Sequence, residues 1–213
     1  MALVRQGRLR AGLEKLLEAA RLEPKNADVH HEIAVVYRNL GKYQEALRHF
    51  QRALTLRPRF PEAWNNLGTL YLILKDWNRA VSAFRKAADD TLYETPYIAY
   101  NNLGLAYFRM GDYRQAISHY RQALRLLPSY SRCYRNLGLA YEALHRWERA
   151  VKAYEKAVFY APGYAAAYVN LGRIYIRLHR PREAAAALRK AMDVDQEGGP
   201  IADEAERLLK DLH

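Results

Sequence analysis

Hydrophobic positions along the chain repeat at intervals of 34 to 36 residues. The pattern is built around a Leu-Gly pair, which occurs at residues 67–68, 103–104, 137–138 and 171–172, with Ile33-Ala34 one period upstream. An aromatic ring or a histidine lies three residues before each pair, and a tyrosine lies three residues after it. Spacings of three and four residues place these side chains on one face of an α-helix, so each period begins with an amphipathic helix.

The second half of each period carries its own apolar pattern. An alanine, a large side chain and a second alanine follow one another at helical spacing, as at Ala46, Phe50 and Ala53. Gly41 and Gly111 separate the two halves in two of the periods, and a proline follows the second half in most of them. A helix pair of this kind cannot bury its apolar face alone, so the pairs are expected to stack into a solenoid.

These positions resemble the tetratricopeptide repeat, in which Trp or Tyr, Leu, Gly, Tyr, Ala, Phe or Tyr, Ala and Pro mark one helix–turn–helix unit. The resemblance covers residues 1–197 and implies an all-α fold, a right-handed superhelical solenoid of such repeats with a C-terminal capping helix. We expect a single domain, residues 1–213, made of a partial repeat at 1–26, full repeats at 27–60, 61–96, 97–130, 131–164 and 165–198, and a capping helix at 199–213.

The first repeat is incomplete. Gly7 lies 34 residues before Gly41 and is therefore expected at a turn between two helices. About two turns of the first helix would then remain, ending at Gly7, and the rest of that helix would precede Met1. Either the natural chain continues upstream of Met1, for example into a targeting segment, or the first helix is naturally short.

The junction between the third and fourth units is longer than the others. It spans residues 88–96, lacks the usual closing proline, and gains two residues, which are expected to expose Leu92 and Tyr93. One interpretation is a neutral loop insertion, since doubling a loop's length costs only about 0.6 kcal/mol. The other is a recognition loop formed by Leu92 and Tyr93, or a local change in the pitch of the solenoid.

The same junction resembles one bacterial repeat family. The run Asp89-Asp90-Thr91-Leu92-Tyr93, followed by Tyr100-Asn101-Asn102-Leu103-Gly104-Leu105-Ala106-Tyr107 and by Gly111-Asp112-Tyr113, is similar to the type IV pilus biogenesis lipoproteins of the PilF/PilW/Tgl type. That resemblance implies a secretin pilotin, an outer-membrane lipoprotein whose periplasmic repeats assist assembly of the secretin ring. The lipid-bearing cysteine of such a protein would lie upstream of Met1.

Catalytic and metal-binding patterns are not found in the sequence. None of the seven histidines forms an HExxH or comparable pair, and glycines occur at helix contacts or turns rather than in a phosphate loop. His145 and His179 take the place of Gly41 and are expected at turns, and Cys133 is expected to be a half-buried, inert thiol. We therefore predict that the protein is not an enzyme and uses neither a cofactor nor a metal.

The first helix of each repeat is expected to line a concave groove. Asparagine recurs two residues before each glycine of the Leu-Gly pairs, at Asn66, Asn102, Asn136 and Asn170. A side-chain amide both donates and accepts, so these residues are candidates for pairing with the backbone of an extended peptide. Alternatively, they tie adjacent helices of the solenoid together.

An apolar strip is expected on the same concave face. Leu72, Ile73, Leu105, Phe108 and Leu139 form it, and an exposed apolar patch marks a binding surface unless neighbouring helices cover it. Arginines flank the strip toward the C-terminus and are suited to an acidic group; they are Arg132, Arg135, Arg173 and Arg177. The predicted peptide-binding set is Asn66, Leu72, Asn102, Leu105, Phe108, Arg135, Asn136, Leu139, Asn170 and Arg173.

The charge balance changes this interpretation little. The chain of 213 residues carries a formal net charge of +11, but its 34 Lys and Arg are spread over almost every repeat, with no basic run containing interleaved aromatics. Nucleic acid is therefore not an expected partner. No stretch approaches the roughly 18 apolar residues needed to span a bilayer, so membrane contact is expected only through a lipid anchor upstream of Met1.

We therefore predict a non-enzymatic protein-interaction scaffold. The leading hypothesis is a pilotin-like assembly factor that binds an apolar segment of a secretin subunit or another pilus component and is located at the periplasmic face of the outer membrane. The alternatives are a bacterial repeat adaptor for another peptide partner, cytoplasmic or periplasmic, and the repeat segment of a larger enzyme.

Overall fold

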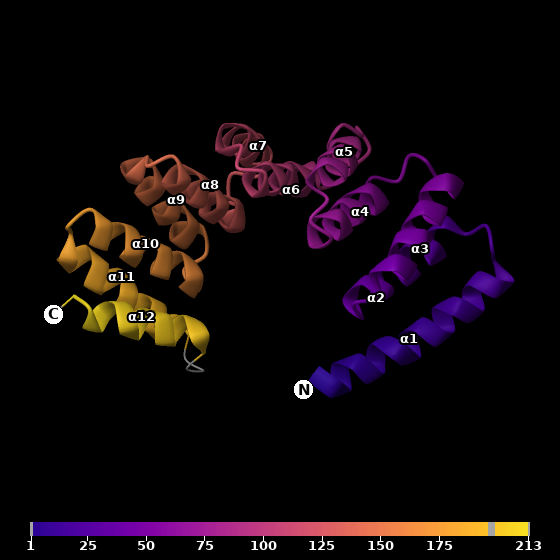
Figure 1. Ribbon diagram of the computed structural model, residues 1–213, viewed down its shortest axis with the longest axis horizontal. Helices are drawn as coiled ribbons and strands as arrows, with labels where there is room; N and C mark the ends of the chain where they lie inside the picture. Colours follow the sequence, from indigo (N-terminus) through magenta and orange to yellow (C-terminus); the bar gives the residue numbers. More distant parts are fainter. Residues whose placement is uncertain (1, 196–198, 213) are drawn as a thin grey trace. The chain divides into compact units, whose positions relative to one another are not determined.

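The structure, a computed structural model, describes residues 2–195 and 199–212, with side chains described from residue 9 onward. These residues form helices and no strand (Figure 1). The helices are α1 (Ala2–Leu22), α2 (Ala27–Asn39), α3 (Tyr43–Leu56), α4 (Pro61–Ile73), α5 (Trp77–Ala88), α6 (Pro96–Arg109), α7 (Tyr113–Leu126), α8 (Ser131–Ala143), α9 (Trp147–Tyr160), α10 (Ala165–Arg177), α11 (Pro181–Val194) and α12 (Pro200–Lys210). The predicted all-α class is confirmed.

The helices gather into two compact units, residues 1–106 and 107–213. In the first unit, α2 packs against α3 and α4 packs against α5, so these two predicted helix pairs form (Figure 1). Its core is apolar and tightly filled: Ile33, Phe50, Leu70 and Phe84 are fully buried. The single domain of residues 1–213 stays a prediction from the repeat pattern.

One prediction for the first unit is wrong. Helix α1 is continuous from Ala2 to Leu22, so Gly7 lies inside a helix and not at a turn. A glycine inside a helix costs only about 1 kcal/mol relative to alanine, and the neighbouring leucine, arginine, glutamine and alanine residues favour helix strongly. Equivalent glycines elsewhere in the chain form turns because packing between the two helices that they join stabilises the reversal of the chain. Helix propensity alone provides no such stabilisation.

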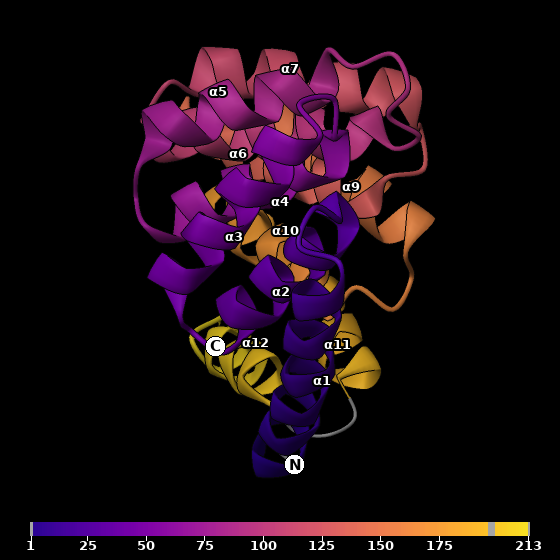
Figure 2. The same ribbon diagram turned by 90° about the vertical axis from the view of Figure 1, so that its right-hand side faces the viewer.

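The second unit repeats the arrangement of the first. Its pairs are α8 with α9 and α10 with α11, and consecutive pairs pack through α7 with α8 and α9 with α10. Helix α12 lies against α10 and α11 (Figures 1 and 2). Its Ala205 is fully buried against Val169, Leu188 and Ala191, so the residues expected to cap the solenoid do cover an apolar face.

The turns within the helix pairs share a left-handed backbone conformation. Gly41 and Gly111 have φ of 75° and 81°, and Lys75, His145 and His179 have φ of 59°, 56° and 56° at the equivalent place. The prediction that the two histidines occupy turns is therefore confirmed. A side chain in this region costs about 1–2 kcal/mol, so the packing of each helix pair stabilises turns that the residues alone disfavour.

Candidate functional site

The asparagines of the first unit bridge neighbouring repeats. Arg38 Nη1 on α2 donates to Asn66 Oδ1 on α4 at 3.0 Å, and Asn66 Nδ2 lies 2.9 Å from His31 Nε2 on α2. Because an amide nitrogen can only donate, His31 Nε2 accepts this hydrogen bond. Asn102 on α6 donates in the same way to Asn65 Oδ1 on α4, at 3.0 Å.

The second unit has an equivalent bridge. Arg135 Nε on α8 donates to Asn170 Oδ1 on α10 at 2.9 Å, and the Asn170 side chain is buried. Two residues predicted to hold a peptide thus hold each other. At Asn66, Asn102 and Asn170 the structure shows contacts between adjacent helices, which is the second alternative offered by the sequence. A role of these amides in peptide binding stays a prediction.

The predicted apolar strip is divided between the two units. Leu72 and Leu105 are half-buried and Ile73 is 43% exposed in the first unit, while Phe108 and Leu139 are half-buried in the second. The Phe108 ring lies 5.2 Å from the Tyr113 ring in an edge-to-face arrangement, which fixes its direction. Each unit therefore carries apolar surface on its first helices that neighbouring helices leave partly open.

The arginines at the C-terminal end of the predicted groove have partners within the chain. Arg173 Nη1 lies 3.7 Å from Glu204 Oε1 of α12, and the Arg177 guanidinium lies 4.5 Å from the centre of the Trp147 ring. Arg173 is predicted from the sequence to receive a partner's carboxylate, and the carboxylate beside it belongs to this chain. That pairing was missed because helical periodicity does not reveal which face of α10 the cap covers.

The buried Tyr154 contacts α8, one of the helices that carry the predicted peptide-binding residues. The Tyr154 ring is buried beneath Gly138, and its hydroxyl donates to Glu142 Oε1 on α8. Burial, reinforced by the Glu142 carboxylate, raises the pKa of Tyr154, while Arg135 and Arg173 oppose that shift. The signal for this contact was present in the sequence, because Tyr154 stands where Phe50 and Phe84 stand in the first unit.

The long junction differs from its prediction at one of two residues. Leu92 is 73% exposed, as expected, but Tyr93 is 7% exposed and therefore buried, so the expected exposure of Tyr93 is wrong. Asp90 accounts for the difference: its carboxylate accepts from the Leu92 N–H at 2.9 Å, and its carbonyl accepts from the Tyr93 N–H at 3.1 Å. This tight turn directs the Tyr93 ring inward and leaves Leu92 as the outward-facing side chain.

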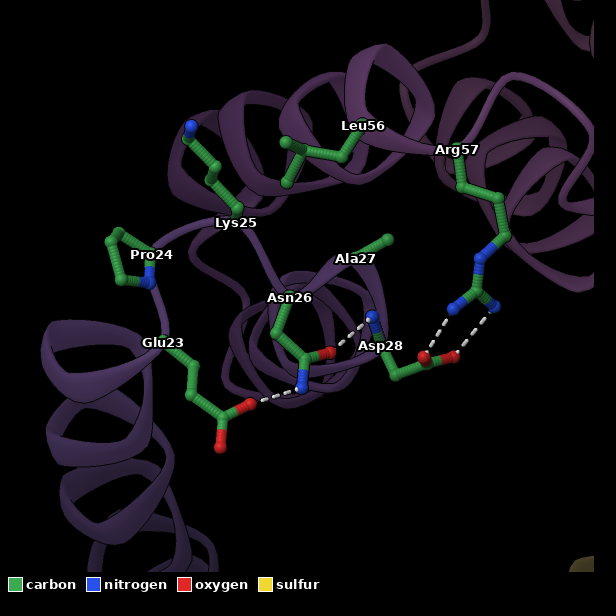
Figure 3. Close-up of a pocket in the computed structure, with 8 residues that line it drawn as sticks. All are labelled: Glu23, Pro24, Lys25, Asn26, Ala27, Asp28, Leu56 and Arg57. Atoms are coloured by element: carbon green, nitrogen blue, oxygen red, sulfur yellow. Dashed lines mark hydrogen bonds and ion pairs between the residues drawn. The ribbon is translucent and has the colours of Figure 1, made fainter.

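A hollow of about 690 Å³ lies where α1, α2 and α3 meet (Figure 3). Its polar groups pair with one another. Asn26 caps α2 by accepting from the N–H of Asp28 and donates to Glu23, and Asp28 forms an ion pair with Arg57 (Figure 3). The arrangement closes the end of a helix pair, and none of the residues that line it belongs to the predicted peptide-binding set.

Two histidines of the first unit are held close together. His30 Nδ1 and His49 Nδ1 lie 3.1 Å apart, and His30 Nε2 lies 3.1 Å from the carbonyl oxygen of Pro24. Since a carbonyl only accepts, His30 Nε2 carries a proton, and in the neutral pair His49 Nδ1 donates to His30. The pKa of His49 is lowered by burial, and further by His30 and Arg48.

The buried and half-buried histidines of the first unit predict that the stability of the fold decreases in the pH range in which histidine takes up a proton. Burial also lowers the pKa of His31, so the unfolded chain binds more protons than the folded chain as the pH falls through about 6.5. The free energy of unfolding should therefore fall between about pH 8 and pH 5, as measured by urea titration followed by circular dichroism. The fall should shrink in His31→Gln/His49→Gln and persist in His179→Gln, whose histidine is exposed; an unchanged slope in the double variant would contradict this assignment.

The part of the chain that the structure describes contains neither a group of side chains arranged to bind a metal nor an accessible thiol. No three His, Cys, Asp or Glu side chains there are grouped so that they could hold a metal ion. Cys133 is fully buried rather than half-buried; its Sγ donates to the Tyr120 carbonyl at 3.4 Å, and burial raises its thiol pKa. A protonated, enclosed thiol of this kind is a poor nucleophile.

No helix among residues 2–195 and 199–212 has both the length and the apolar character needed to traverse a bilayer.

Comparison with known families identifies the class of protein. Tetratricopeptide repeat models match residues 15–48, 35–74, 59–129, 95–158 and 143–203. Since these matches run without a gap from residue 15 to residue 203, the chain belongs to the tetratricopeptide repeat family. Members of this class are stacked helix pairs, in agreement with the fold described above.

The proteins that are similar to this chain differ widely in length. Human protein O-mannosyl-transferase TMTC1 is 40% identical over 68 residues, and this chain spans only 7% of its length. Among solved structures, PilW, described as a type IV pilus biogenesis factor, has a TM-score of 0.84 and 21% identity, with 95% of this chain and 93% of that one covered. Pseudomonas aeruginosa PilF has a TM-score of 0.80 and 20% identity, covering 97% and 92%, and MamA has 0.67 and 28%, covering 78% and 95%. The pilus proteins thus share the fold over nearly their whole length.

Proposed function

We propose that the protein is a non-enzymatic scaffold that binds an apolar peptide segment on its first helices. The observation that carries this proposal is the partly open apolar surface of each unit, with Ile73 and Leu105 in one and Phe108 and Leu139 in the other. Burial of each large side chain contributes on the order of 1.5–3 kcal/mol, and association costs reduce the total to roughly micromolar binding. No bond of the partner is made or broken in this role.

The partner we infer is a component of type IV pilus assembly, with a secretin subunit as the leading candidate. Two observations support this choice. The long junction has the run Asp89 to Tyr93 that resembles the pilus lipoproteins, and the fold matches PilW over 95% and PilF over 97% of this chain. In this role the chain would be held by a lipid anchor at the periplasmic face of the outer membrane.

Binding is tested by placing a charge on the apolar surface. Phe108→Asp should reduce capture of purified secretin subunits at least about tenfold, because an aspartate cannot be buried without loss of its hydration. The circular dichroism spectrum should not change, since Phe108 is only half-buried. Leu22→Asp is the matched control. Leu22 is 79% exposed on α1, so this variant should bind secretin subunits as the original protein does. Full binding by Phe108→Asp would refute the groove.

The cellular role is tested separately. The native protein is fractionated from its own cells, its mass is measured, and secretin multimers are followed after deletion of its gene. An acylated protein in the outer-membrane fraction and loss of multimers would support the pilus role. An unmodified cytosolic protein with normal multimers would instead favour an adaptor for another peptide.

A further inference from the structure

The second helices of the unit 107–213 end in a strongly basic surface. Six exposed cations lie within residues 121–126 of α7, 152–160 of α9 and 189–194 of α11, and we call them the basic end: Arg121, Arg125, Lys152, Lys156, Arg189 and Lys190. The same stretches hold two carboxylates, Glu155 and Asp193, and Glu155 accepts a hydrogen bond from the Tyr175 hydroxyl at 3.0 Å. Positive charge therefore dominates this part of the unit.

Exposed apolar side chains project from the same helix ends. Leu126 is 51% exposed at the end of α7, and Phe159 and Tyr160 are 75% and 40% exposed at the end of α9. Leu126 and Tyr160 occupy the same repeat position, 34 residues apart. The Tyr160 ring stacks on Tyr134 with centroids 5.6 Å apart, whereas Phe159 meets Tyr160 only edge-on. Tyr160 is thus anchored, and Phe159 points outward.

We propose that this surface binds an anionic phospholipid bilayer, with Phe159 inserted among the lipid headgroups and the basic end facing their phosphates. An aromatic ring next to lysine and arginine is the combination that holds proteins at the membrane interface. Clustered cations add attraction to anionic lipid that decays within a Debye length. This inference does not rest on the proposed peptide binding, because it uses the second helices and not the first.

The geometry favours a bilayer over a peptide as the occupant. A peptide is recognised in a groove or on a strand edge, where side chains converge on it. Here the Phe159 ring projects, and the cations are distributed over three helices. Among the described residues, Arg125, Lys152, Arg189 and Lys190 form no ion pair with a carboxylate. A deformable and diffusely negative surface satisfies both features without a preformed pocket.

The test is sedimentation of the purified protein with vesicles of phosphatidylcholine alone and of phosphatidylcholine mixed with phosphatidylglycerol. We expect binding to the anionic vesicles only, weakened by added salt. Phe159→Gln should lower the partition coefficient by about tenfold, because one large apolar side chain no longer enters the interface. Lys152→Gln/Lys190→Gln should lower it at least about tenfold through lost attraction to the lipid.

The matched control removes equal charge elsewhere. Lys15 and Lys25 are exposed in the first unit, and Lys15→Gln/Lys25→Gln should bind vesicles like the original protein. The proposal is overturned by absence of binding to anionic vesicles, by equal binding to neutral ones, or by equal losses in the two lysine variants. It is also overturned if Phe159→Gln binds normally. Binding to duplex DNA without binding to anionic vesicles would assign the basic end to nucleic acid instead.

Discussion

Gly138→Ala should lower the free energy of unfolding by about 1–3 kcal/mol, because the added methyl group has no space. A Cβ at this position would lie 2.7 Å from Cδ1 and Cζ of the Tyr154 ring. That ring is fully buried and its hydroxyl is bonded to Glu142, so it cannot turn aside. Thermal and urea unfolding followed by circular dichroism measure the loss, which corresponds to a few degrees per kcal/mol for a chain of this size.

Two further glycines serve as controls for this prediction. Gly172→Ala meets Leu188, an aliphatic side chain that no hydrogen bond fixes in place, and should cost less than Gly138→Ala. Gly12→Ala lies inside α1 with no atom within 4 Å of the new Cβ, and should stabilise the protein by about 0.5–1 kcal/mol. Equal losses in all three variants would show that the close approach of Gly138 to Tyr154 is not the cause.

Asn66→Leu should lower the free energy of unfolding by about 1–3 kcal/mol, the cost of leaving buried polar groups without partners. The substitution removes both hydrogen bonds that join α2 to α4 in the first unit. It leaves His31 Nε2 without its donor and Arg38 Nη1 without its acceptor. The measurement is the urea midpoint at neutral pH, since burial lowers the pKa of His31 and so favours its uncharged form.

The control for Asn66→Leu is a double variant that also removes His31, the acceptor that loses its donor in the single variant. Replacing both His31 and Asn66 with leucine removes the acceptor together with its donor, and should cost less than the sum of the two single changes. Additive losses in this double-mutant cycle would show that the two side chains act independently. They would then contribute through burial alone, and the bridge between α2 and α4 would carry no stability of its own.

Most of the helix arrangement was predictable because the same pattern of apolar residues recurs in successive repeats, so each helix is indicated several times along the chain. The Leu-Gly pairs, the buried aromatic rings and the left-handed turns follow from spacing, and the structure places His145 and His179 where that spacing predicts. The turn expected at Gly7 does not form, because among the described residues no helix precedes α1 to pack against it. A turn residue specifies a turn only when packing on both sides supports it.

The candidate site was less predictable, since helical periodicity assigns faces to residues but not partners. Asn170 and Arg135 both lie on the predicted face, and the structure shows that they bond to each other. Arg173 was expected to bind a carboxylate of a partner protein, but its guanidinium lies beside the carboxylate of Glu204 on α12. Tyr93 was expected outside because the junction is long, and a single turn at Asp90 directs it inward. The contacts of Asn170 and Arg173 depend on three-dimensional proximity between helices, and the burial of Tyr93 depends on a local turn whose hydrogen bonds the repeat spacing does not specify.

The shared conformation of the turns has a consequence for how this chain tolerates change. Gly41 and Gly111 enter the left-handed region without strain, but they must surrender more backbone entropy on folding than other residues. Lys75, His145 and His179 carry strain of about 1–2 kcal/mol but restrict the unfolded ensemble. The two effects oppose each other, so glycine and non-glycine turns become nearly interchangeable. Substitutions can accumulate at this position without shifting the register of the helices that it joins.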